Sequence, residues 1–232
     1  MNLASRFPSD LVTPDLGPKM YNAHASDDEQ GGKGTTKLHL DITDAVSSHS
    51  HTESLTNGKV NIMTYATPNE VSGSRGGAAV WDIFPATATN NLRTFLKRTS
   101  HYDIDDPVMR QQFYISTPQL AQLREEHHIT PWRIYQNPGD AVFIPAGCAH
   151  QVCNLTSCIK IACDFVSPHC ISRCRDLIEG TRRLAGVRGG KKEDVLQLKT
   201  MMMCAWEEMA RWEKQASSKM QEEEGNGQME GI

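Results

Sequence analysis

Residues 139–150 read Gly-Asp-Ala-Val-Phe-Ile-Pro-Ala-Gly-Cys-Ala-His, and this stretch decides the fold. The apolar run 142–145 lies between the turn signal Gly139-Asp140 and a second glycine, Gly147, which indicates a short strand that ends at a tight corner. The corner leads to His150 at the start of the next strand-like segment. Short strands joined in this way are typical of a mainly β protein of the barrel or jelly-roll kind.

A second polar pair could meet His150 inside such a barrel. Residues 38–46 alternate apolar and polar side chains, so His39 and Asp41 project to the same face of a strand. Two histidines and one carboxylate form the facial triad of non-haem Fe(II) oxygenases, which leaves coordination positions for a co-substrate and O₂. An H-x-D pair alone is more often a surface couple, but together with the 139–150 stretch it predicts an Fe(II) site at His39, Asp41 and His150.

Lys160 suggests the co-substrate. It lies inside the apolar run 158–162, where a buried ammonium group is costly unless an anion meets it. The distal carboxylate of 2-oxoglutarate, whose keto-acid end chelates iron, could be that anion, with further contacts from Thr36 and Asn61. Two alternatives remain open: an internal salt bridge of Lys160 with Asp164, or an edge-strand lysine whose head group reaches water.

Composition limits the class of protein. The 232 residues suffice for one sizeable domain, and 38% hydrophobic residues exclude a wholly disordered chain. No apolar stretch approaches the ~20 residues that span a bilayer, and a net charge of −4 argues against nucleic-acid binding through bulk positive charge. Seven cysteines without a C-x-x-C pair indicate buried free thiols in a reducing compartment, either cytosol or nucleus.

The pattern predicts a β-rich core that is followed by helices. We expect a catalytic core over residues 1–168, a helical region over 169–220 that packs on it, and a disordered acidic tail over 221–232. The Trp206 and Trp212 side chains should pack either onto the barrel or onto a second copy in a homodimer. The expected elements are an irregular segment over 1–37, strands over 38–46, 60–65, 78–84, 132–136, 140–145 and 151–165, a loop over 47–59, and helices over 89–97, 118–127 with Thr117 as N-cap, 168–184 and 193–219.

Several motifs resemble one known family. They are Pro14-Asp15-Leu16-Gly17-Pro18-Lys19-Met20-Tyr21-Asn22-Ala23, the 38–46 segment, residues 139–147 with His150-Gln151-Val152, Asn154-Leu155, Ser157-Cys158-Ile159-Lys160, and Asp164-Phe165-Val166-Ser167-Pro168. With these motifs, the chain resembles the JmjC-domain histone demethylases of the lysine demethylase 3 group. The resemblance starts inside that family's catalytic domain, and residues 47–59 interrupt a segment that is continuous in the family.

This resemblance implies a specific reaction and a set of partners. It implies a nuclear Fe(II)- and 2-oxoglutarate-dependent dioxygenase of cupin fold, with His39, Asp41 and His150 as iron ligands. Such an enzyme removes methyl groups from mono- and dimethylated lysine-9 of histone H3 by N-methyl hydroxylation and releases formaldehyde. The partner would be the histone H3 tail in chromatin, without membrane association or sequence-specific DNA binding. Two alternatives stay open: a chromatin-binding JmjC remnant with impaired catalysis, and a protein hydroxylase of the same fold.

Overall fold

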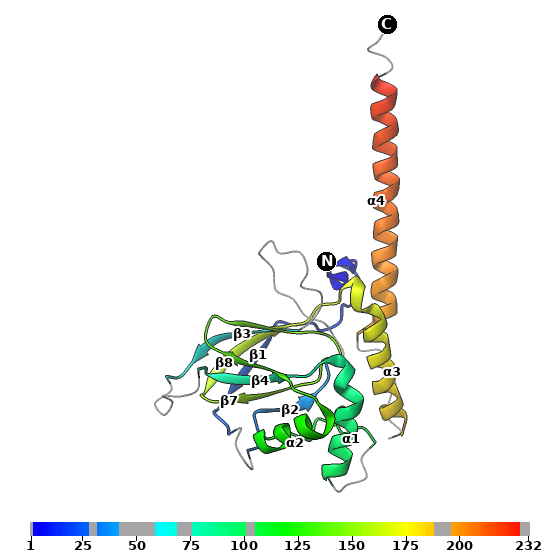
Figure 1. The fold of residues 1–232 in the computed structure, drawn as a ribbon. Coiled ribbons are helices and arrows are strands. Elements are labelled where there is room, and N and C mark those ends of the chain that lie inside the picture. Colours follow the sequence, from blue (N-terminus) through cyan, green and yellow to red (C-terminus); the bar gives the residue numbers. More distant parts are fainter. Residues whose placement is uncertain are drawn as a thin grey trace.

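A computed structural model describes residues 2–27, 32–41, 59–68, 76–100, 105–187 and 196–227. Two four-stranded antiparallel sheets face each other and form a jelly roll with flanking helices (Figure 1). The predicted cupin or jelly-roll core with flanking C-terminal helices is therefore confirmed. One sheet has the order β1 (Lys19–Ala23), β8 (Cys158–Cys163), β3 (Lys59–Ala66) and β6 (Ala141–Ile144), and the other β2 (Thr36–His39), β7 (His150–Asn154), β4 (Ala79–Ile83) and β5 (Trp132–Gln136).

Apolar side chains from both sheets fill the space between them. Along β8, buried and partly exposed residues alternate, so Cys158, Lys160 and Ala162 point inward. The inter-sheet core includes Met63, Trp81, Ile83, Val142, Ile144, Val152 and Cys158. Lys160 is thus a charged residue on the inward face of a central strand, as its apolar sequence context predicts.

Two helices cover one end of the sandwich. Helices α1 (Thr89–Ser100) and α2 (Thr117–His127) share a buried cluster with Leu38, Phe84 and Ala149, residues next to the metal-binding candidates. A short 3₁₀ turn, η2 (Ala86–Ala88), precedes α1. The N-cap of α2 is Ser116 and not Thr117, because the backbone N–H of Ser116 donates to the Gln119 side chain at 3.0 Å in a capping box.

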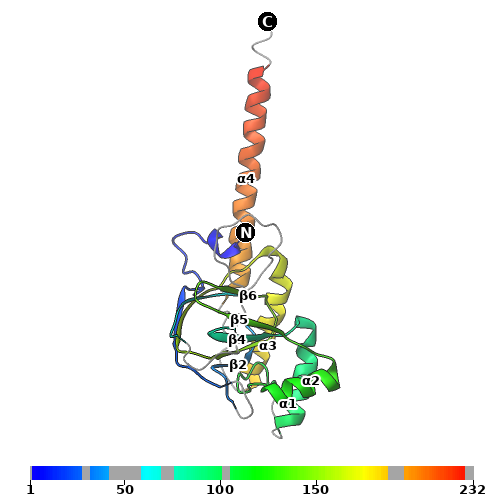
Figure 2. The same ribbon diagram turned by 60° about the vertical axis from the view of Figure 1, so that its left-hand side comes forward.

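The C-terminal helices pack on the N-terminal turn of the chain. The buried residues Leu3, Cys174, Ile178 and Met201 join η1 (Leu3–Arg6), η3 (Pro168–Cys170), α3 (Ile171–Val187) and the start of α4 (Leu198–Gly227). The rest of α4 extends away from the sandwich (Figures 1 and 2).

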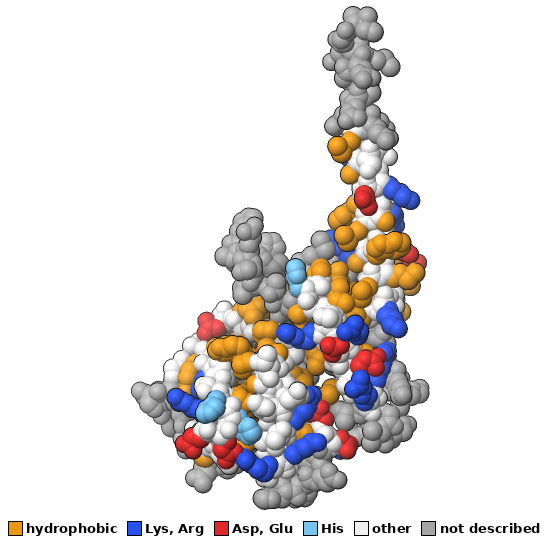
Figure 3. Space-filling view, turned by 45° about the vertical axis from the view of Figure 1, so that its right-hand side comes forward, with side chains coloured by type: hydrophobic (Ala, Val, Ile, Leu, Met, Phe, Trp, Pro, Cys, Tyr) orange, Lys and Arg blue, Asp and Glu red, His pale blue; other side chains and the backbone are white. Residues whose placement is uncertain are grey.

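The free part of α4 carries exposed apolar side chains. Trp206 is 69% exposed and Met209 is 59% exposed, and Figure 3 shows hydrophobic side chains along this helix. The prediction that Trp206 packs onto the barrel is therefore wrong. Trp212 instead lies beneath the guanidinium of Arg6, 4.7 Å from its ring centroid. Packing onto a second copy stays a prediction.

The boundaries of several elements differ from the sequence-based expectation. Helix α4 begins at Leu198 rather than at 193, and it continues through Gly227 rather than ending at 219. The disordered acidic tail over 221–232 stays a prediction. The segment 1–37 is not wholly irregular, because it contains η1, β1 and the start of β2. The predictions for residues 42–58 and 228–232 lie outside the described residues.

The seven cysteines are free, and all are buried except the half-buried Cys163, which confirms the expected thiols. Among the helices of the described residues, none is long and apolar enough to cross a membrane.

Candidate metal centre and co-substrate pocket

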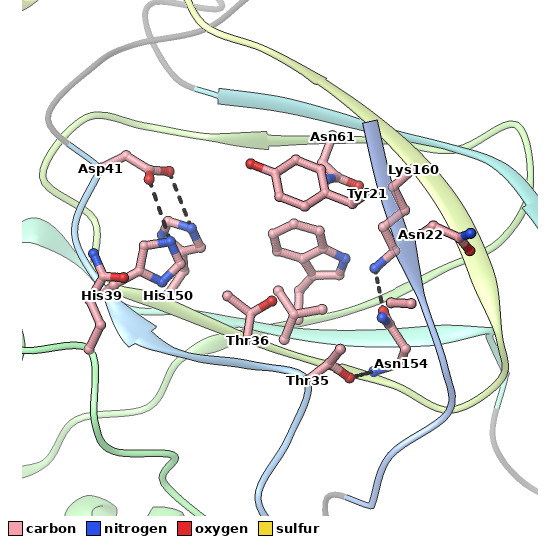
Figure 4. Close-up of a pocket in the computed structure, with 14 residues that line it drawn as sticks. Tyr21, Asn22, Thr35, Thr36, His39, Asp41, Asn61, His150, Asn154 and Lys160 are labelled. Carbon is pink, nitrogen blue, oxygen red and sulfur yellow. Dashed lines mark hydrogen bonds and ion pairs between the residues drawn. The ribbon is translucent and has the colours of Figure 1, made fainter. Parts of the chain in front are cut away.

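The backbone brings His39, Asp41 and His150 together. His39 ends β2 and His150 starts β7, and the two residues are direct partners in the antiparallel register. Asp41 lies two residues beyond His39, with its Oδ1 3.4 Å from His39 Nε2 and its Oδ2 3.4 Å from His150 Nε2 (Figure 4). One ligand atom from each residue lies within 4.8 Å of the others.

The hydrogen bonds of the two histidines prepare this site for a cation. His39 Nδ1 lies 2.7 Å from the Lys37 carbonyl oxygen, and His150 Nδ1 lies 3.1 Å from that of Cys148. Because a carbonyl only accepts, each Nδ1 must carry the proton and donate. With Nδ1 as the donor, Nε2 of each ring is the atom that faces the Asp41 carboxylate and could bind a metal. Three electron-pair donors that converge in this way fit a divalent metal, with the two backbone carbonyls fixing the tautomers.

A glycine corner sets the position of His150. Gly147 has φ +73°, and a Cβ there would lie 2.7 Å from the Arg173 side chain. Arg173 in turn donates to the Ala146 carbonyl at 3.1 Å. The corner that the sequence predicts is thus present, and glycine is required because larger residues rarely adopt this backbone conformation.

The triad opens into a cavity of about 460 Å³ between the two sheets. Its polar side chains come from both sheets and include imidazole, carboxylate, amide, hydroxyl and ammonium groups. The lining residues are Tyr21, Asn22, Ala23, Thr35, Thr36, His39, Asp41, Asn61, Trp81, Gln111, His150, Val152, Asn154 and Lys160.

Lys160 lies at the opposite end of the cavity from the triad (Figure 4). It is 4% exposed, and its Nζ donates to Asn154 Oδ1 at 2.6 Å and lies 5.1 Å from the Trp81 ring centroid. Burial lowers the pKa of Lys160 to about 8, an effect that the nearby thiols of Cys158 and Cys153 partly offset. An anion beside Nζ would raise this pKa again, because a nearby negative charge favours the ammonium form.

The alternative salt bridge of Lys160 does not form in the described residues. Asp164 pairs with Lys19 of β1 at 2.8 Å. Among the residues that the structure describes, no carboxylate lies within ion-pair distance of Lys160, whose hydrogen-bond partner is the neutral amide of Asn154. The predicted salt bridge between Lys160 and Asp164 is therefore wrong.

The remaining predicted contacts line the same cavity. Thr36 lies on β2 and is exposed to it, whereas Asn61 on β3 is buried. The sequence-based reasoning missed Tyr21, Trp81 and Asn154 as pocket residues. Tyr21 is the register partner of Lys160 across β1 and β8, but β1 lacks an apolar alternation, so no period-2 signal marks it as a strand.

The sequence also offers Asp103, Asp105 and Asp106 as an acidic loop that could contact a basic histone tail, and Asp103 lies outside the described residues. Asp105 pairs with Arg110 and Asp106 with Arg93, at 2.8 and 2.7 Å. These carboxylates are therefore already neutralised by neighbouring cations.

Comparison with known proteins agrees with this geometry. Residues 71–165 match the family described as JmjC domain, hydroxylase. The chain contains a JmjC domain. It is 38% identical over 223 residues to Lysine-specific demethylase 3A-A of Xenopus laevis. The alignment covers 87% of this chain and 16% of that protein.

Two further relatives are similar over most of this chain. The identity is 39% to Lysine-specific demethylase 3 of Drosophila melanogaster, over 87% of this chain and 26% of the relative. It is 33% to Lysine-specific demethylase JMJ26 of Arabidopsis thaliana, over 90% of this chain and 28% of the relative. The chain thus spans less than a third of the length of these relatives.

Proposed function

We propose that this JmjC domain is an Fe(II)- and 2-oxoglutarate-dependent dioxygenase that removes methyl groups from histone lysine. One observation carries the proposal: a His-Asp-His donor set and a buried lysine occupy opposite ends of a single cavity. A molecule with a chelating group at one end and a carboxylate at the other matches this arrangement. 2-Oxoglutarate has that structure.

The donor set would hold iron through His39, Asp41 and His150. Three protein ligands leave the other positions open for a keto acid and O₂. Bound iron would supply the oxidation of the N-methyl carbon by O₂, coupled to decarboxylation of 2-oxoglutarate to succinate. The hydroxylated methyl group then leaves the lysine nitrogen as formaldehyde.

The protein's own residues would orient the co-substrate and keep water out. The Lys160 ammonium would bind the distal carboxylate, with the Thr36 hydroxyl and the Asn61 amide as neighbouring donors. The apolar surfaces of Trp81 and Val152 line the space between the two ends. Such a cavity would fix the keto acid relative to the metal and exclude solvent from the reaction.

The substrate follows from the relatives and from the motifs. The relatives are named lysine-specific demethylases, and the motif resemblance adds mono- and dimethylated lysine-9 of histone H3. We extend both to this chain, with the H3 tail in chromatin as the partner and the nucleus as the compartment.

The test is turnover of a dimethyl-lysine-9 H3 peptide with Fe(II), 2-oxoglutarate and O₂. We expect formaldehyde and succinate in equal amounts, and none from His150→Ala. His169→Ala is a matched control, because His169 lies at the exposed start of the C-terminal helices. Peptide binding without product above the His150→Ala background would favour the non-catalytic remnant. Succinate without demethylated peptide would favour a protein hydroxylase.

A further inference from the structure

Gln136 is a fully buried amide behind the co-substrate cavity. It is the last residue of β5, it is 0% exposed, and it does not line the cavity itself. A buried amide is costly unless its hydrogen-bonding groups find partners. The partners of Gln136 therefore indicate what this residue fixes in place.

Its oxygen holds Trp81. The indole N–H of Trp81 donates to Gln136 Oε1 at 2.9 Å. The Trp81 ring stacks on His150, with ring centroids 6.2 Å apart and an interplanar angle of 22°, while Lys160 Nζ lies 5.1 Å from the Trp81 ring centroid. One indole therefore contacts a candidate metal ligand and the candidate carboxylate-binding cation.

The side-chain nitrogen of Gln136 forms hydrogen bonds to the opposite sheet. Gln136 Nε2 donates to the Asn61 backbone oxygen at 2.8 Å and to the Asp140 carbonyl at 3.2 Å, and it lies 3.5 Å from Asn61 Oδ1. β5 and β3 belong to different sheets, so this amide joins the two walls of the cavity. It also selects one orientation, because a rotated amide would place its NH₂ group against the indole N–H.

We propose that Gln136 is a positioning residue for the co-substrate, a role that rests on the proposed function. It acts through Trp81 and Asn61, which line the cavity from the two sheets. Together these contacts fix the distance and orientation between the metal end and the Lys160 end. Loss of the amide should therefore weaken binding of a ligand that must reach both ends.

The first measurement is calorimetric titration of 2-oxoglutarate into the chain loaded with Mn(II) in the absence of O₂, since Mn(II) accepts the same donor types. Gln136→Met has a similar size and no amide. We expect the Kd for 2-oxoglutarate to rise about tenfold, while the KM for the H3 peptide stays within about twofold. A merely structural defect would change both constants.

Gln136→Glu provides a rescue that depends on pH. Its acid form can accept from Trp81 and donate to the Asn61 carbonyl, whereas its ionised form faces two carbonyl oxygens, and burial favours the acid form. The ratio of its Kd to the wild-type Kd should therefore fall toward one as the pH is lowered.

Gln151→Met is the matched control. Gln151 is also 0% exposed and loses three hydrogen bonds, to Asp82 and to the backbone of Ile115, none of which lines the cavity. We expect a lower melting temperature with an unchanged 2-oxoglutarate Kd. If Gln136→Met had the wild-type Kd for 2-oxoglutarate, or if Gln151→Met raised this Kd as much as Gln136→Met does, the role of Gln136 would be contradicted while the proposed function would stand. Failure of the wild type to bind 2-oxoglutarate would overturn the proposed function as well.

Discussion

The two ends of the cavity are held in place by different means. At the metal end, the ring nitrogens of His39 and His150 are oriented by backbone carbonyls, and the two residues are register partners in one sheet. At the other end, Lys160 is oriented by side chains, namely the Asn154 amide and the Trp81 ring. The position of the two histidines therefore depends on the strand register, whereas the position of the Lys160 ammonium depends on a series of side-chain contacts.

This difference predicts two kinds of response to substitution. Substitution of a neighbouring side chain should not move the backbone carbonyls that orient the histidines. Metal affinity should therefore be lost only when one of the three ligands is removed. The Lys160 end should weaken by steps, because each side-chain contact contributes on the order of 1 kcal/mol. The variants below test that contrast, from the largest expected effect to the smallest.

Removal of the carboxylate ligand should have the largest effect. Asp41→Ala leaves two imidazoles on the same side of the site, and we expect the affinity for Fe(II) or Mn(II) to fall by more than about 100-fold, since loss of an outer-shell partner alone costs 10- to 100-fold. Equilibrium dialysis measures the metal, and formaldehyde release should fall to background.

Asp105→Ala is the control for this variant, because its carboxylate pairs with Arg110 outside the cavity. It should bind metal like the wild type. Unchanged metal binding by Asp41→Ala would contradict the metal centre itself.

Removal of the buried cation should act on the other end only. Lys160→Met should raise the Kd for 2-oxoglutarate by about 10- to 100-fold, the range of a hydrogen bond to a charged group, and should leave metal affinity unchanged. The same variant should raise the melting temperature of the ligand-free protein, because an apolar side chain replaces a buried ammonium.

Lys19→Met provides the opposite pattern. It leaves the buried Asp164 carboxylate without its 2.8 Å partner, so the melting temperature should fall while the 2-oxoglutarate Kd stays constant. If Lys160→Met bound 2-oxoglutarate as tightly as the wild type, the anion site would have to lie elsewhere.

The contrast also explains what the sequence could predict. His39 and His150 were predictable because each lies at a strand end, the second one after the Gly147 corner. Asp41 lies near them although β2 ends at His39, so the strand predicted over 38–46 does not account for its direction. That Lys160 is buried followed from its apolar run, but its partner did not. Lys160 bonds to Asn154 rather than to Asp164, because Asp164 forms an ion pair with Lys19 of β1. The sequence of β1 has no periodic pattern that would predict this strand. Contacts between side chains of strands that are distant in the sequence cannot be predicted from local sequence patterns.

The shifted pKa of Lys160 predicts how co-substrate affinity depends on pH. Burial lowers this pKa from 10.5 to about 8 in the ligand-free protein. The ammonium is needed to bind the carboxylate, so the Kd for 2-oxoglutarate should rise as the pH increases above 8. Lys160→Arg keeps its charge, and its Kd should change less over the same range. Parallel profiles for the two proteins would contradict the assignment.

The same shift affects stability with a definite sign. Between pH 8 and 10.5 the unfolded chain holds more protons at Lys160 than the folded chain, so the free energy of unfolding rises with pH. Relative to Lys160→Met, the wild type should gain on the order of 3 kcal/mol over this interval. Urea denaturation at several pH values measures this difference. A wild-type deficit that grows with pH would show that the ammonium is stabilised, not destabilised, by its site.

The smallest expected effects separate two neighbouring threonines. Thr35 Oγ1 accepts from the Asn154 backbone N–H at 2.7 Å, whereas Thr36 lies in β2 with its side chain toward the cavity (Figure 4). Thr36→Val should raise the 2-oxoglutarate Kd about fivefold, through the loss of one hydroxyl contact of about 1 kcal/mol, without a change in stability. Thr35→Val should instead lower the free energy of unfolding by about 1 kcal/mol and weaken 2-oxoglutarate binding less, because the Thr35 hydroxyl already accepts from the Asn154 backbone N–H. Titration calorimetry and urea denaturation of both variants decide the matter: if Thr35→Val weakened binding more than Thr36→Val, the carboxylate would depend on the Asn154 backbone rather than on the Thr36 hydroxyl.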